Sequence, residues 1–109
     1  MSDRPSVYIA GPMRGHEYNN HFAFDEAAEF LNGLGYFVFS PAQMDRDQGS
    51  DLSKVNTMRS PERRKVFERD IAALTKCDAI YMLNGWRGSP GAKAERAVAE
   101  AVGIMVIEQ

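Results

Sequence analysis

Four short apolar runs, separated by longer amphipathic stretches, constrain the fold of this 109-residue chain more than any other feature. The runs are Val7–Ala10, Tyr36–Phe39, Ala79–Leu83 and Ile104–Ile107. They are short and continuously apolar, which is typical of strands buried on both faces of a parallel sheet. We therefore expect four such strands.

Three helices are predicted between these strands. The first two cover about Asn20–Leu34 and Ser60–Lys76, and the third opens with Ser89-Pro90-Gly91 and continues through Ala92–Val102. Two of them begin with Ser followed by Pro, and two are followed directly by Gly, which are ordinary helix start and stop signals. In the first helix we expect these residues to contribute to the core: Phe22, Ala27, Phe30, Leu31 and Leu34.

The alternation of strands and helices predicts an α/β fold with right-handed crossovers. We expect a single domain over residues 1–109, a small flavodoxin-like or Rossmann-like three-layer sandwich. Its four-stranded parallel sheet would have the order 2-1-3-4, with helices on both faces. Ligands of such sheets bind at the carboxyl ends of the strands. That edge would gather Gly11–Gly15, Ser40–Pro41 and Asn84–Gly91. We expect Pro41–Met58, which follows no clear period, to be a long loop flanking or covering the site.

The composition favours a soluble globular protein over a duplex-nucleic-acid-binding or membrane protein. Hydrophobic residues make up 44% of the chain and the net charge is -2, which is typical of a soluble globular protein and argues against binding of duplex nucleic acid. No apolar run has the length of a membrane span or of a signal-peptide core. With one cysteine, Cys77, and no metal-ligand spacing, we expect a cytoplasmic protein without a metal or cofactor. His16 and His21 are interpreted as surface residues.

Glu95 is the polar residue that fits this pattern least well. On a helical projection, Lys93, Arg96 and Glu100 share one polar arc, whereas Glu95 falls between Ala99 and Val102 on the inward side. Burying a lone carboxylate costs several kcal/mol unless it is paired or lines a cavity. Glu95 is therefore a candidate site residue.

Asp70 repeats this anomaly on the preceding helix, where it projects into the arc of Val66 and Leu74. A buried ion pair with Arg63 or Arg59, which holds the helix in place, would explain it equally well. Two inward carboxylates beside one strand, however, favour glycosidic chemistry, in which one acts as nucleophile and the other handles a proton or anchors the sugar.

Four further residues are candidates, Tyr8 near the centre of the sheet and the other three at its carboxyl edge. Tyr8 needs a hydrogen-bond partner if it is buried, and Glu95 is within geometric reach. Ser89 and Gly91 stand at a helix start that can bind a phosphate group, although they can equally serve only to turn the chain and cap the helix. Trp86 can stack on a base or cover the core.

These residues carry a resemblance to a known family. The segment Val7–Gly15, then Arg69-Asp70 eight residues before Asp78, then Gly88–Gly91 followed by Glu95, resembles the nucleoside 2-deoxyribosyltransferase superfamily over nearly the full length. Within it, the turn at Met13–Gly15 and the Ser89-x-Gly91 element look most like the deoxynucleoside 5'-monophosphate N-hydrolase branch. The chain as a whole is closest to small phage and bacterial domains of unassigned function in that superfamily.

The resemblance implies a role for each residue. Glu95 would be the nucleophile, Asp70 would position the sugar or handle the proton of the base, and Tyr8 would orient Glu95. The following residues would bind the substrate or its phosphate: Gly11, Met13, Arg14, Gly15, Trp86, Ser89 and Gly91. The implied partner is a small-molecule nucleoside or nucleotide, no cofactor is required, and a homodimer or higher homo-oligomer is expected.

This sequence departs from the family pattern at two places. Family enzymes continue past the last strand, and their tail contributes to a neighbouring active site, whereas this sequence ends at Gln109. Pro12 and Pro90 each lack an N–H group that could bind phosphate. A non-catalytic nucleotide-binding module is therefore the alternative function, and a scaffold with ion-paired carboxylates is a third.

Overall fold

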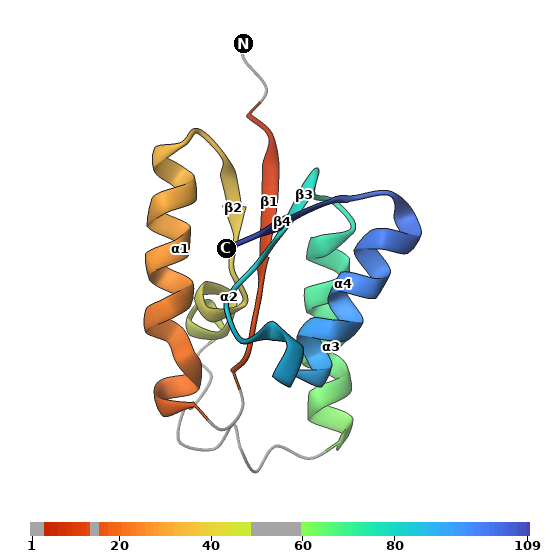
Figure 1. Ribbon diagram of the computed structural model, residues 1–109. Helices are drawn as coiled ribbons and strands as arrows, with labels where there is room; N and C mark the ends of the chain where they lie inside the picture. Colours follow the sequence, from red (N-terminus) through yellow and green to blue (C-terminus); the bar gives the residue numbers. More distant parts are fainter. Residues whose placement is uncertain (1–3, 14–15, 49–59) are drawn as a thin grey trace.

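A computed structural model describes residues 4–13, 16–48 and 60–109 of the protein. The strands are β1 (Ser6–Ala10), β2 (Phe37–Phe39), β3 (Ala79–Met82) and β4 (Met105–Glu108). They form one parallel sheet in the order β2-β1-β3-β4 (Figure 1), and the predicted α/β fold and strand order are therefore confirmed. The helices are α1 (His21–Gly33), α2 (Pro41–Asp47), α3 (Ser60–Leu74) and α4 (Pro90–Val102). Two short 3-10 helices, η1 (Glu17–Asn20) and η3 (Trp86–Gly88), precede α1 and α4.

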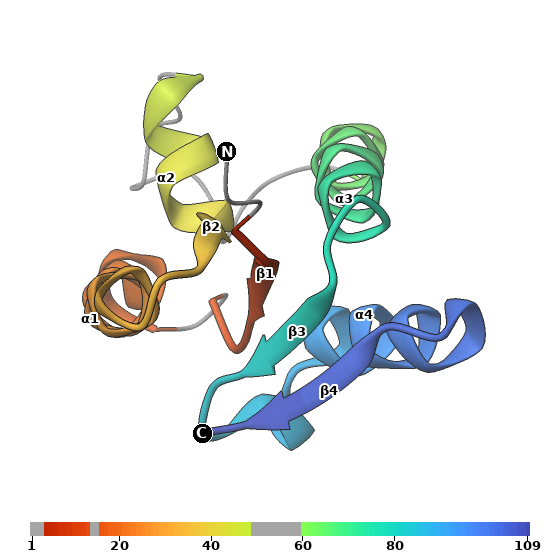
Figure 2. The same ribbon diagram turned by 90° about the horizontal axis from the view of Figure 1, so that it is seen from above.

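The helices cover both faces of the sheet, α1 on one side and α3 with α4 on the other (Figures 1 and 2). Because side chains alternate along each strand, β1 supplies both cores. Val7 and Ile9 pack with Phe24 and Leu31 in the core under α1. Tyr8 and its neighbours pack in the core under α3 and α4, which contains Ala10, Ala73, Leu74, Cys77, Ile80, Met82, Ala92 and Ala99. We call these the α1 core and the α3/α4 core.

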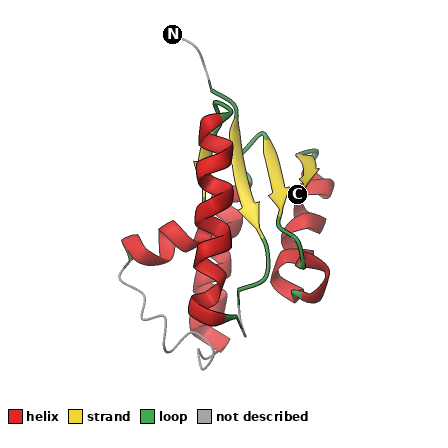
Figure 3. Ribbon diagram, turned by 60° about the vertical axis from the view of Figure 1, so that its left-hand side comes forward, coloured by secondary structure: helices red, strands yellow, loops and turns green. Residues whose placement is uncertain are grey.

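The expectation that all four strands are buried on both faces is only half correct. β1 and β3 are buried almost throughout, but Phe37 of β2 is 53% exposed and Met105 of β4 is 57% exposed. These two strands are the edges of the sheet, so each has a strand neighbour on one side only. Figure 3 shows that the strands point in the same direction, so their carboxyl ends meet at one edge.

The segment predicted as a loop over Pro41–Met58 instead begins with a helix. Pro41 is the first residue of α2, after an extended Ser40, and the Gln43 side chain bonds Asp47 one turn later at 2.8 Å. The Ser-Pro start signal was present in the sequence, but two turns of mostly polar residues show no clear period. Residues 49–58, which make up most of the rest of the expected loop, lie outside the described part of the chain.

The buried face of the first helix differs from prediction, whereas the inward position of Glu95 agrees with it. Phe22 and Phe30 of α1 and Leu34 directly after it are exposed, and Phe24 takes the central place in the core. On α4 the buried residues are Ala92, Glu95 and Ala99, so Glu95 lies at the centre of the buried face. In the part of the chain that the structure describes, no helix combines the length and apolar character that a membrane crossing requires.

Candidate active site

Glu95 lies in the α3/α4 core as an almost fully buried carboxyl group. Ser89 caps α4, its Oγ accepting the Ala92 N–H at 3.2 Å, and Pro90 follows as the first helical residue. This start places Ala92, Glu95 and Ala99 on one line of the helix, facing the sheet. Glu95 therefore points inward because its neighbours one turn away on either side are small, buried alanines.

Tyr8 is the hydrogen-bond partner of this carboxyl group. Its hydroxyl donates to Glu95 Oε2 at 2.5 Å, which is the contact expected from the sequence. Burial, and then the charges of Glu95 and Asp70, raise the pKa of Tyr8 well above its ordinary value. The Tyr8 hydroxyl therefore keeps its proton at physiological pH and can donate it to the ionised form of Glu95.

Burial controls the ionisation of Glu95. It raises the pKa of this carboxyl group to about 8, against the smaller stabilisation of the ionised form by the Tyr8 hydrogen bond. The negative charge of Asp70 adds to the rise, and the positive charge of Arg69 opposes it. A carboxyl group with such a shift in a polar cluster is typical of a functional site.

Asp70 is the second buried carboxyl group, and it is 8% exposed. Burial raises its pKa to about 6, although Arg69 lowers the value by charge and by hydrogen bonding. The partner is therefore Arg69, the adjacent residue, at 2.7 Å. Arg63, the partner expected from helical spacing, is exposed, and Arg59 lies outside the described residues. Asp70 thus forms an ion pair with Arg69, and its negative charge also acts on Glu95.

The structure adds residues that the sequence analysis did not assign to the site. Asp45 of α2 is 7% exposed and bonds Arg69 at 2.8 Å. His21, expected at the surface, is 6% exposed, and its Nε2 lies 3.8 Å from Asp45 Oδ2. His16 is exposed as expected. Asp45 was hidden because the helix that buries it was not recognised.

The predicted substrate-binding residues are only partly brought together. Ser89 and Gly91 lie at the start of α4, less than two turns before Glu95. Gly11 follows β1 and is needed for packing, since a Cβ there would lie 2.7 Å from the Leu83 Cβ. Met13 packs against the α1 core, on the other face of the sheet. Arg14 and Gly15 lie outside the described residues.

Trp86 lies between two guanidinium groups. Arg87 and Arg96 stand 4.6 and 4.8 Å from the centre of its ring, and its Nε1 donates to Glu108 Oε1 at 3.2 Å. Its ring also packs against the α3/α4 core. These contacts agree with the alternative that Trp86 covers the core.

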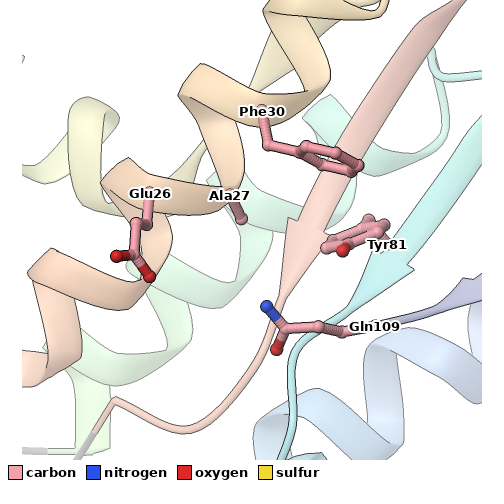
Figure 4. A pocket seen from close by; sticks show the side chains of 5 residues that line it. All are labelled: Glu26, Ala27, Phe30, Tyr81 and Gln109. Atoms are coloured by element: carbon pink, nitrogen blue, oxygen red, sulfur yellow. The ribbon is translucent and has the colours of Figure 1, made fainter.

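A hollow of about 320 Å³ lies apart from this cluster, between α1 and the ends of β3 and β4. Glu26, Ala27, Phe30, Tyr81 and Gln109 line it (Figure 4). Tyr81 belongs to the α1 core, whereas Tyr8 and Glu95 lie on the opposite face. The hollow holds no paired carboxyl groups, so we place the candidate active site at Glu95. No group of three His, Cys, Asp or Glu side chains suited to a metal ion occurs among residues 4–13, 16–48 and 60–109.

Comparison with known proteins shows which family the sequence belongs to. Residues 5–108 match the family described as "Domain of unknown function (DUF4406)". The chain belongs to the DUF4406 family. No curated protein matches this DUF4406 chain.

A solved structure shares the fold. The DUF4406 chain is similar to a 2-deoxyribosyltransferase from the psychrotolerant bacterium Bacillus psychrosaccharolyticus, with a TM-score of 0.69 and 23% sequence identity. The match covers 94% of this chain and 70% of the transferase chain. The likeness establishes that the DUF4406 chain has the same fold as that enzyme.

Proposed function

We propose that this DUF4406 chain cleaves or transfers the N-glycosidic bond of a (deoxy)nucleoside or its 5'-monophosphate, with Glu95 as the nucleophile. The observation that carries the proposal is the buried Glu95 carboxyl group, bonded to Tyr8 at 2.5 Å and coupled to the buried carboxyl group of Asp70. The similarity to a 2-deoxyribosyltransferase, which is a similarity of fold, supports a nucleoside as the substrate class.

The reaction has two steps. A carboxylate oxygen of Glu95 attacks C1' of the sugar, the C1'–N bond breaks, and its electron pair leaves with the base. The base takes the proton of the neutral Asp70 carboxyl group. Water or a second base then attacks C1', the bond from C1' to Glu95 breaks, and Asp70 accepts the proton of the incoming group. Both carboxyl groups thereby return to their initial state.

This mechanism needs one proton shared between the two carboxyl groups. The pKa of Asp70 is about 6 and that of Glu95 is about 8, so between these values the pair holds one proton, which resides mainly on Glu95, the weaker acid. The reactive form, with Glu95 ionised and Asp70 neutral, is the minor arrangement of that proton, and transfer of the proton from Glu95 to Asp70 supplies it. Below this window neither group is ionised, and above it neither can donate a proton. We therefore expect a bell-shaped dependence of kcat/KM on pH, with limbs near these two values.

The start of α4 gives little support to a strong preference for a 5'-phosphate. Pro90 has no N–H, the Ala92 N–H is bonded to Ser89 Oγ, and the Lys93 N–H is bonded to the Ser89 carbonyl at 3.0 Å. Gly91 is the remaining donor of this first turn. We therefore propose that a nucleoside is accepted at least as well as its 5'-monophosphate.

The test is to incubate the protein with a panel of nucleosides and 5'-monophosphates and to measure the freed base by chromatography, with and without a second base as acceptor. Release of base that is lost in Glu95→Ala and strongly reduced in Asp70→Asn is the expected result. Release that persists in Glu95→Ala would overturn the mechanism. Tight binding with every ligand recovered intact would instead support a non-catalytic binding module.

A further inference from the structure

Arg69 bonds three side chains around the candidate site: its neighbour Asp70, and Asp45 and Gln48 from the region of α2. Its Nε and NH2 donate to Asp70 Oδ1 at 3.0 and 2.7 Å, NH2 also donates to Asp45 Oδ1 at 2.8 Å, and NH1 donates to Gln48 Oε1 at 2.9 Å. The Arg69 side chain is 15% exposed, and those of Asp45 and Asp70 are 10% and 11% exposed. One guanidinium group thus joins α2 to α3 through two buried carboxylates.

The hydrogen bonds from Arg69 reach only one of the two carboxyl oxygens of Asp70. Every hydrogen bond that Asp70 receives from the described residues reaches Oδ1, and none reaches Oδ2. A planar guanidinium group fixes the orientation of a carboxylate, which an ammonium group does not. Arg69 therefore holds the Asp70 carboxyl group in one orientation through Oδ1, and within residues 4–13, 16–48 and 60–109 no hydrogen bond occupies Oδ2.

Asp45 in turn fixes Arg69. It sits on the buried side of α2, with His21 of α1 at 3.8 Å from its Oδ2. Arg46, the basic residue of α2, is bonded to Asp25 at 2.8 Å and lies 3.3 Å from His21 Nδ1, so it faces α1. Among the described residues, Arg69 is the cation bonded to both Asp45 and Asp70.

The charges around Asp70 act in opposite directions. Arg69 lowers the pKa of Asp70 and of Glu95, whereas Asp45 raises the pKa of Asp70. In the part of the chain that the structure describes, Tyr8 of β1 and Glu95 of α4 also interact electrostatically with Asp70. The Asp45–Arg69 bridge therefore has an electrostatic effect as well as a geometric one.

The geometry points to Arg69, held by Asp45, as the positioning residue that presents Asp70 Oδ2 to the leaving base. This inference rests on the proposed function and deepens it. It assigns α2 a part in the reaction through Asp45, without contact to the substrate. The Asp70 proton is transferred from Oδ2 to the base as the C1'–N bond breaks, and it is returned to Oδ2 in the second step.

The test compares Arg69→Gln, Arg69→Lys and Asp45→Asn by base release across pH. Arg69→Gln should move both limbs of the profile to higher pH, by about one unit or more, because a nearby cation is lost. Asp45→Asn should move the acid limb to lower pH, because a nearby anion is lost. Arg69→Lys should keep the limbs near their original pH while kcat falls by up to about 100-fold, since the charge remains but the orientation of Asp70 does not.

If the Asp45–Arg69 bridge only stabilises the fold, a different result is expected. All three variants would then lose activity only in proportion to their unfolded fraction, measured by thermal unfolding, with limbs unmoved, and that result would overturn the inference. The titration of the Asp70 and Glu95 carboxyl carbons, followed by NMR in the wild type and in Asp45→Asn, gives the same answer without turnover. If the wild type releases no base, the proposed function fails. A lower Asp70 pKa in Asp45→Asn would still support the bridge, and an unchanged value would refute it.

Discussion

The two faces of the sheet are built from alternate residues of the same strands, but they differ in what they bury. Under α1, Val7 and Ile9 meet Phe24 and Leu31 in an apolar core. Under α3 and α4, Tyr8 meets a carboxyl group that has one hydrogen bond from it and a pKa of about 8. Apolar burial stabilises the fold, whereas burial of a carboxyl group works against it. Both faces therefore contribute apolar core to the fold, and the face under α3 and α4 in addition buries the carboxyl groups to which our proposal assigns the reaction.

Glu95→Gln is the substitution from which we expect the largest effect. The variant should retain the fold and lose at least about 1000-fold in base release, since the nucleophile is gone while the shape is kept. Glu100→Gln, on the same helix but exposed and paired with Arg96, is the matched control and should keep full activity. Equal losses in both variants, measured by chromatography of the base, would contradict a special role for Glu95.

Tyr8→Phe should have the next largest effect. It removes a hydrogen bond to a charged group, worth about 1.5–3 kcal/mol, so we expect activity to fall about 10- to 100-fold. That bond favours the ionised form of Glu95, so its loss should raise the pKa of Glu95 and move the alkaline limb of the profile to higher pH. A Tyr8→Phe profile identical to that of the wild type would show that the bond has no part in the reaction.

Leu31→Ala tests whether the α1 core, on the other face of the sheet, contributes to stability without affecting activity. Leu31 is 2% exposed in the α1 core, and its truncation should reduce the free energy of unfolding by about 2–5 kcal/mol. Activity per folded molecule should stay unchanged, because the cavity opens on the side away from Glu95. Leu34→Ala, at a position 61% exposed, is the control and should change stability little. Denaturant titration with parallel assays would reveal any coupling between the two faces.

The last prediction concerns the pH dependence of stability. Burial raises the pKa of Glu95 from 4.5 to about 8, so the folded state binds this proton more tightly than the unfolded state does. Glu95 therefore disfavours folding progressively as the pH rises from about 4.5 to about 8. Glu95→Gln should remove this contribution, and its melting temperature should fall less over that interval. A melting temperature with the same slope in both proteins would argue against the raised pKa.

Much of this arrangement could be predicted from the sequence because it depends on local periodicity. The strand order follows from continuous apolar runs, and Glu95 and Asp70 are visible as polar residues on otherwise apolar helix faces. The Tyr8–Glu95 bond follows once β1 and α4 are placed. Their catalytic roles remain predictions.

The remaining features depend on contacts between distant segments. Asp45 is buried only because α2 folds against Arg69, and Trp86 is enclosed by Arg87 and Arg96, so neither environment is encoded in a local period. The exposed Phe22 of α1 was misassigned to the core because apolar residues occur on two sides of that helix. Composition along one helix cannot distinguish which side meets the sheet.

The central claim, that the buried carboxyl group of Glu95 is the nucleophile, is tested most directly by trapping the glycosyl-enzyme. The wild type is mixed with an accepted nucleoside, quenched in acid during turnover and analysed by mass spectrometry. Our account predicts an added glycosyl group on the peptide that contains Glu95, and no such group in Glu95→Gln. An added glycosyl group on a different peptide, or base release by Glu95→Gln at the wild-type rate, would contradict it.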